Sequence, residues 1–247
     1  MVMTQEIPTR WLSTPLGRRC LATEQRLVRR TLERMFGEQC LQIGIWGSTD
    51  SFLPYARTQR ATSLEWRDGL TASVRSRTDR LAVASDSIDV VLLPHTLELI
   101  PSPHVLLREV DRVLRADGYL VVLSFQPSGP WGLRHLLSRR GYPPGHQRLI
   151  REGRLRDWLE LLSFEIGTRE RYCHALPLEQ IRRFGTLPTE RWASRWLPGL
   201  GGGYLLSAQK RVHPLTPIRR PWAQRHLKVV GGLVEPTARA PQRRQPQ

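Results

Sequence analysis

The sequence predicts an α/β domain in which a doubly wound, mostly parallel sheet of seven strands has helices on both faces. Two continuous apolar runs, 87–93 and 119–125, are typical of central strands that are buried on both sides. Between them, residues 102–114 show the apolar spacing of a helix. A strand, a helix and a strand in this order form a βαβ unit, whose right-handed crossover makes the two strands parallel.

The elements before this unit follow the same alternation. Thr14 and Pro15 predict the start of an amino-terminal helix, because a capping hydroxyl precedes proline at the first helical position, and Gly37 is expected to stop it. Residues 40–46 predict the first buried strand. Segment 52–60 is a weak helix candidate, because Pro54 fits only its first turn. Segments 61–66 and 70–76 predict the second and third strands.

After residue 125, an insertion with a short helix is expected, followed by an amphipathic helix over 154–164. Segments 165–172 and 204–211 predict the sixth and seventh strands. The expected organisation is a helical extension over 1–37, the α/β domain over 38–211 and a tail over 212–247.

The positive charge is concentrated at the carboxyl-terminal end. The chain of 247 residues carries a net charge of +16, and half of this excess lies in residues 209–247, which hold nine Lys/Arg and one acid. The same segment is rich in Pro, Arg and Gln, which predicts a disordered basic tail. Such a tail suits contact with nucleic acid or an acidic partner; a purely solubilising role is the alternative.

Other classes of protein are disfavoured by what the sequence lacks. No apolar stretch approaches the ~20 residues of a membrane span, and the first residues have no signal-peptide core, so a cytoplasmic location is expected. Cys20, Cys40 and Cys173 are scattered along the chain. They form neither a disulfide framework nor a metal pattern, so no metal is expected.

Residues 79–125 resemble the middle of class I S-adenosylmethionine-dependent methyltransferases, in the type 11 methyltransferase-domain group found in bacteria. The resemblance rests on Leu81, the strand entry 87–89, the helix 106–114 and the turn 115–118. It implies a Rossmann-like methyltransferase fold with S-adenosyl-L-methionine as the cofactor. It also implies direct displacement of the methyl group onto an acceptor that the sequence does not identify.

The resemblance places the first cofactor loop at 41–48. Gly44 matches a family glycine, and Ile45, Trp46 and Gly47 complete the expected cofactor contacts. Trp46 stands where a second glycine is usual, so the glycine-rich loop is degenerate. The alternative is an ordinary turn at the end of a strand, with a packed tryptophan.

The remaining site residues follow later strands. Glu65 lies 21 residues after Gly44 and is expected to accept both ribose hydroxyls; a solvated acid beside Arg67 is the alternative. Asp79 follows the third strand and is expected to meet the adenine. Pro94 ends the fourth strand beside the cofactor.

His95 follows at the point where methyl donor and acceptor would meet. Its imidazole suits a general base, and a polar residue that merely closes the strand is the alternative.

Two other functions remain open at this stage. A catalytically inactive methyltransferase fold could act as a scaffold, with the basic tail contacting RNA or an acidic partner. A structure with Trp46 filling the adenosine site would favour this reading. A nucleotide-dependent oxidoreductase is a weaker alternative, because the chain lacks a full G-x-G-x-x-G motif.

Overall fold

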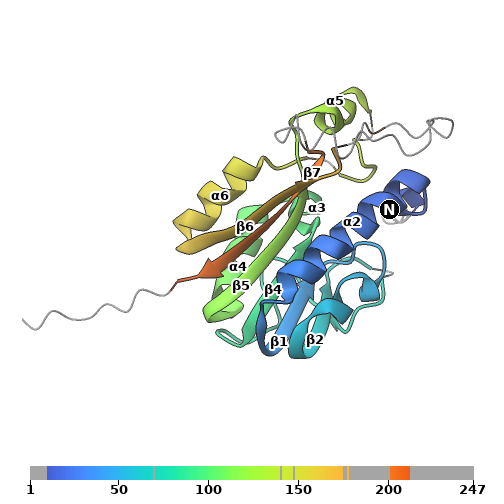
Figure 1. Ribbon diagram of the computed structural model, residues 1–247. Coiled ribbons are helices and arrows are strands. Elements are labelled where there is room, and N and C mark those ends of the chain that lie inside the picture. The colour runs from blue at the N-terminus through green and yellow to red at the C-terminus, as the bar shows by residue number, and fades with distance from the viewer. Residues whose placement is uncertain are drawn as a thin grey trace, which may run out of the picture. The chain divides into compact units, whose positions relative to one another are not determined.

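The computed structural model describes residues 10–68, 70–139, 141–146, 148–174, 177 and 201–211. Within them, one sheet of seven strands has the order β3-β2-β1-β4-β5-β7-β6 (Figure 1). Its strands are β1 (Phe36–Ile43), β2 (Arg57–Glu65), β3 (Val74–Arg75), β4 (Ile88–Pro94), β5 (Leu114–Phe125), β6 (Phe164–Tyr172) and β7 (Gly203–Lys210). The chain also forms the helices α2 (Pro15–Leu32), α3 (Thr96–Leu99), α4 (Pro103–Val113), α5 (Pro130–Leu137) and α6 (Glu152–Leu161).

The sheet confirms the predicted fold class. Strands β3, β2, β1, β4 and β5 run parallel to one another, and β7 is antiparallel to both β5 and β6. The sheet has a buried core on each face. Along β4, Val91 and Leu93 belong to one core and Val90 and Leu92 to the other, as the period of two in a strand requires.

Helices cover both faces. α4 and α6 supply apolar side chains to the core that contains Val91, whereas α2 packs into the opposite core. Figure 1 shows α2 lying along one face of the sheet. Thr14 caps α2 as expected, because its hydroxyl accepts a hydrogen bond of 3.1 Å from the amide of Gly17. The helix ends at Leu32 rather than at Gly37, which lies inside β1.

The connection between β1 and β2 is short and has no α-helix. Residues 44–56 form only two 3-10 turns, η1 (Thr49–Ser51) and η2 (Leu53–Tyr55). The weak helix expected over 52–60 is therefore wrong, since Pro54 sits in η2 and β2 begins at Arg57. The third strand is present but contains only Val74 and Arg75.

No helix among the described residues is long and apolar enough to cross a membrane. The described residues belong to one compact unit. The predicted basic tail at 212–247 lies outside the described residues.

Candidate functional site

The first predicted loop leaves β1 through two glycines with left-handed backbone. Gly44 has a φ of +88° and Gly47 a φ of +83°. Residues with a side chain rarely adopt this backbone conformation. A Cβ atom on Gly44 would lie 2.7 Å from Oγ1 of Thr96 and 3.1 Å from the indole of Trp66. The strand end thus needs glycine because two other elements approach its backbone closely.

Trp46 points into the core rather than toward the groove, described below, that opens at the carboxyl ends of β2 and β3. Its side chain is buried in the core beneath α2, where Nε1 donates a hydrogen bond of 2.8 Å to Oε2 of Glu24. Its ring centroid lies 4.4 Å from that of His95 and 6.0 Å from that of Trp11. The indole therefore does not fill the groove, and only the backbone of Trp46 is left for a cofactor contact.

Glu65 ends β2 with a fully buried carboxylate that accepts five hydrogen bonds. Oε1 accepts from the amides of Trp66 and Arg67 and from Nε of Arg67, at 3.0, 3.1 and 2.9 Å. Oε2 accepts from the amide of Ile45 at 3.0 Å and from Nη2 of Arg67 at 2.8 Å. The acid does lie beside Arg67, but it is enclosed rather than solvated.

A groove of about 840 Å³ opens at the carboxyl ends of β2 and β3. It is lined by Glu65, Trp66, Asp68, Arg75, Ser76, Arg77, Thr78, Asp79, Pro101, Ser102 and Val105. Asp79 is exposed on its rim, where Nη2 of Arg77 lies 2.6 Å from its carboxylate and lowers the pKa of that carboxyl group. The structure thus brings Glu65 and Asp79 to one groove, where Arg67 and Arg77 already pair with them.

The lining of the groove offers groups that suit the nucleoside part of a cofactor. It has an aromatic wall in Trp66 and a carboxylate at its inner end. A carboxylate offers about four lone-pair sites, and Glu65 already accepts five donors. Ribose hydroxyls can therefore reach Glu65 only when the Arg67 side chain, which is 15% exposed, moves aside.

A second cluster of polar groups lies deeper, at the end of β4. Pro94 is buried there, and the backbone of His95 adopts a left-handed conformation with a φ of +55°. Nδ1 of His95 lies 3.0 Å from Oε2 of Glu98, and Nε2 lies 3.0 Å from Oε1 of Glu24. Burial alone would lower the pKa of His95, but the carboxylates of Glu24 and Glu98 raise it to about 9.

More buried groups enclose this cluster. The hydroxyl of Tyr172 donates to Oε1 of Glu24 at 3.0 Å, and His146 lies with Nε2 3.3 Å from Oε2 of Glu98. Cys20 and Cys173, distant in the sequence, meet here with sulfur atoms 3.2 Å apart. Both ring nitrogens of His95 are engaged and the side chain has no exposed surface, so its role as a general base stays a prediction.

Sequence reasoning missed Glu24, Glu98 and His146. Glu98 has a weak local signal, since it follows His95 by three residues, the spacing that places two side chains on one face of a helix. Glu24 and His146 have none, because α2 and the segment after α5 reach His95 only through tertiary packing. Arg67 lies two residues from Glu65, but nothing in the sequence indicates that its guanidinium pairs with that carboxylate.

Comparisons with known proteins agree with the fold. A family model described as a methyltransferase domain matches residues 43–122. The chain is 33% identical over 214 residues to the uncharacterized protein YafS of Escherichia coli K12, covering 85% of this chain and 83% of YafS.

An uncharacterized protein of Mycobacterium tuberculosis H37Rv is 27% identical over 175 residues, covering 68% of this chain and 60% of that protein.

Solved structures share the fold at low identity. A SAM-dependent methyltransferase from Thermotoga maritima superposes with a TM-score of 0.60 at 18% identity, covering 82% of this chain and 94% of the other. A SAM-dependent methyltransferase from Archaeoglobus fulgidus gives a TM-score of 0.57 at 16% identity, with 77% and 94% covered. These likenesses concern the fold and leave the acceptor open.

Proposed function

Because this chain belongs to the class I S-adenosylmethionine-dependent methyltransferase family, we propose that it binds S-adenosylmethionine at the β2–β3 groove and methylates an acceptor. The observation that carries this proposal is the Glu65 carboxylate at the inner end of the groove, beside the aromatic wall of Trp66. A buried acid at this strand end is suited to accept two hydroxyl groups of a ribose. A fold alone would not support the activity.

Different residues of the chain would bind different parts of the cofactor. Gly44 and Gly47 let the backbone of the first loop approach a ligand closely, and Glu65 holds the hydroxyls once Arg67 has left. Asp79, on the rim, is placed to meet the base. The cofactor supplies a methyl group on a sulfonium, which a nucleophile of the acceptor displaces directly. Positioning and exclusion of water provide most of the rate in such a reaction.

Calorimetry with S-adenosylmethionine and S-adenosylhomocysteine on the full chain tests the proposal. Glu65→Gln removes the charge that accepts the hydroxyls and is expected to weaken binding about tenfold or more, equivalent to ~1.4 kcal/mol. Arg67→Ala frees the carboxylate without removing it, so this variant is expected to bind about tenfold more tightly than the wild type.

Glu160→Gln and Arg156→Ala are the matched controls. These residues form an exposed Glu–Arg pair on α6, 3.5 Å apart and outside the groove, so neither change is expected to alter binding. If neither nucleoside binds the wild type at millimolar concentration, the methyltransferase proposal fails. If Arg67→Ala binds more weakly than the wild type, Arg67 is a ligand-binding residue rather than a competitor.

A second candidate is a non-catalytic scaffold on the same fold. Arg67 already pairs with the Glu65 carboxylate, and the ring of Trp66 lies close to Gly44. Both arrangements leave less room for a cofactor, which favours the scaffold. On this reading the basic tail contacts RNA or an acidic partner. Deleting residues 212–247 is then expected to reduce retention of RNA at low salt; unchanged retention counts against a tail-driven role.

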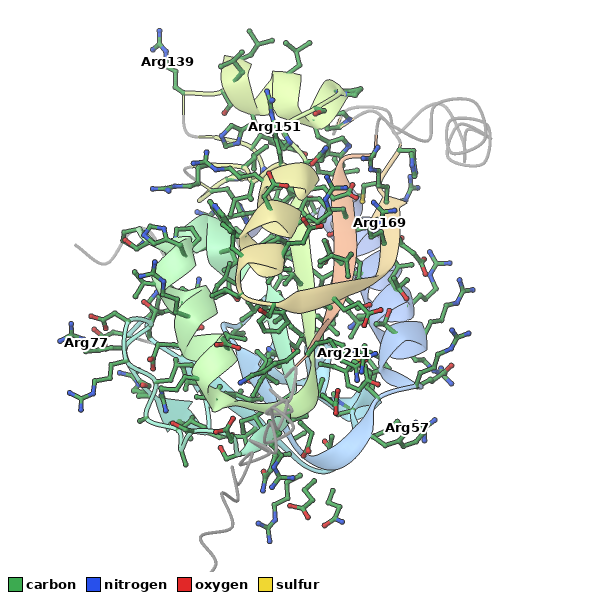
Figure 2. The ribbon with its side chains drawn as sticks, turned by 90° about the vertical axis from the view of Figure 1, so that its left-hand side faces the viewer. Arg57, Arg77, Arg139, Arg151, Arg169 and Arg211 are labelled. Atoms are coloured by element: carbon green, nitrogen blue, oxygen red, sulfur yellow. The ribbon has the colours of Figure 1, made fainter. Side chains whose placement is uncertain are left out.

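The arginines of the described domain do not add an obvious partner surface. Figure 2 shows the labelled side chains of Arg57, Arg77, Arg139, Arg151, Arg169 and Arg211 emerging from widely separated parts of the ribbon. Several of them are neutralised locally; Arg211, for example, pairs with Glu165 and Asp117 at 2.6 and 3.0 Å. This dispersion is the reason that the scaffold reading depends on the tail.

A further inference from the structure

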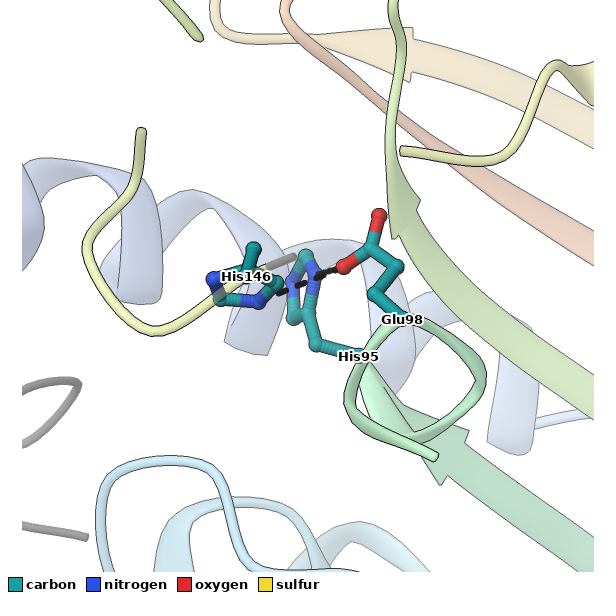
Figure 3. A group of neighbouring side chains, drawn as sticks. All are labelled: His95, Glu98 and His146. Carbon is teal, nitrogen blue, oxygen red and sulfur yellow. Dashed lines mark hydrogen bonds and ion pairs between the residues drawn. The ribbon is translucent and has the colours of Figure 1, made fainter. Parts of the chain in front are cut away.

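Two imidazoles and one carboxylate converge in a buried position at the end of β4 (Figure 3). His95 comes from the turn after β4, Glu98 from α3, and His146 from the segment between α5 and α6. Oε2 of Glu98 lies 3.0 Å from Nδ1 of His95 and 3.3 Å from Nε2 of His146. These three atoms all lie within 4.8 Å of one another, and all three side chains are buried.

The tautomer of His146 leaves a lone pair aimed at the carboxylate. Nδ1 of His146 lies 3.1 Å from the carbonyl oxygen of Pro143, which can only accept, so Nδ1 carries the proton. In the neutral ring, Nε2 then carries a lone pair and no proton. Nε2 also has no hydrogen-bond partner among the described residues. Two acceptors, Nε2 and a carboxylate oxygen, thus face each other, an arrangement that a cation between them would stabilise.

Hydrogen bonds to other groups orient His95, Glu98 and His146 in the way that metal ligands are usually oriented. Histidines that bind a metal through one ring nitrogen donate the other N–H to a carboxylate or a carbonyl. Here Nε2 of His95 meets Oε1 of Glu24, and Nδ1 of His146 meets the Pro143 carbonyl. Oε1 of Glu98 accepts from the Ser124 hydroxyl and the Phe125 amide, which leaves Oε2 for the two histidines.

We propose that His95, Glu98 and His146 bind one divalent transition-metal ion through Nδ1, Oε2 and Nε2 respectively, with zinc as the best match. Nitrogen and carboxylate ligands suit zinc, and bonds of ~2.1 Å around a tetrahedral ion place ligand atoms ~3.4 Å apart. Magnesium and calcium prefer all-oxygen sites. The set contains no cysteine, so the cysteine spacing that led us to expect no metal does not bear on it.

Charge supports the same ion. Two acids, Glu24 and Glu98, are buried around His95. A divalent cation between His95, Glu98 and His146 would offset both carboxylates, and its affinity is expected to fall at acid pH because metal ligands bind in their deprotonated forms.

Metal analysis of the full chain, purified without chelator and incubated with zinc sulfate, tests the site without any nucleoside. About one zinc ion per chain is expected after gel filtration. His146→Gln is expected to lose this zinc while the control His104→Gln keeps it, because His104 is an exposed histidine on α4. Far-UV circular dichroism verifies that both variants fold.

Wild-type protein without zinc above background, or folded His146→Gln with undiminished zinc, would overturn the site. If His146→Gln does not fold, titration of the chelator-treated wild type with Co²⁺ decides the question. Visible absorption bands that saturate at about one ion per chain and vanish on adding zinc support the site, and their absence refutes it. Since no nucleoside is present, this result is independent of whether the methyltransferase proposal holds.

Discussion

Glu65 and Glu98 are both buried carboxylates at the carboxyl edge of one sheet, but they are neutralised by different kinds of partner. Glu65 lines an open groove, and the side chain of Arg67, which pairs with it, is 15% exposed. Glu98 faces His95 and His146, which have no such access, beneath an aromatic cover that includes Trp46 and Phe125. Ligand exchange at the first carboxylate therefore needs only a side-chain movement, whereas an ion can reach the second only when the cover opens.

The largest expected effect comes from removing the central cation of the closed cluster. His95→Ala leaves Glu24 and Glu98 buried without the imidazole between them, and breaking a buried pair in this way costs about 3–5 kcal/mol of unfolding free energy. Urea unfolding measures the loss, with His104→Ala as the exposed control. A loss no greater than that of His104→Ala would show that the cluster is not sealed.

A smaller loss of stability is expected at the groove. Arg67→Ala leaves Glu65 with three backbone amide donors, from Ile45, Trp66 and Arg67 itself, and with access to water. The cost is therefore expected to be about 1 kcal/mol. If urea unfolding gives a value equal to that of His95→Ala, the distinction between an exchangeable and a sealed carboxylate is wrong.

The smallest effect concerns a carboxylate at the opposite end of β4. Partial burial raises the pKa of Asp89, but the amides of Gln39 and Glu38 and the guanidinium of Arg115 lower it overall. Since the folded pKa is lowered, its contribution is present above the ordinary value of about 4 and is lost as pH falls toward the folded value.

Asp89→Asn is expected to flatten the acid side of the stability profile by less than about 1 kcal/mol. Thermal unfolding between neutral and acid pH checks this, and a steeper acid loss in the variant would contradict the sign.

The sequence was a good guide to the sheet because its signals are local. The apolar runs at β4 and β5 and the cap at Thr14 depend on neighbours a few residues away. All three elements formed, although β5 begins at Leu114 and takes in the turn expected over 115–118. Glu65 and Asp79 also reached one groove, because carboxyl ends of parallel strands share an edge of the sheet. A packed Trp46 was one of two interpretations of this loop, but its partners beneath α2 depend on tertiary packing and have no local signal.

The buried cluster was hidden for a physical reason. Glu24, His95 and His146 come from three segments separated by more than fifty residues, and no spacing rule relates a helix face to a loop that packs on it. An acid on α2 also looks like an ordinary surface residue, because charged positions alternate with apolar ones along that helix. Only the packing of α2 on the sheet shows that Glu24 faces inward.

The position of β7 has a consequence for biogenesis. This strand is the last of the sheet to leave the ribosome, yet it pairs with both β5 and β6 and separates them. A nascent or truncated chain that ends before Gly203 presents two unpaired edges with apolar side chains, which are templates for aggregation. Completion of the domain must therefore wait for synthesis of residues 203–210, and premature stop codons upstream are expected to yield insoluble product rather than a smaller working domain.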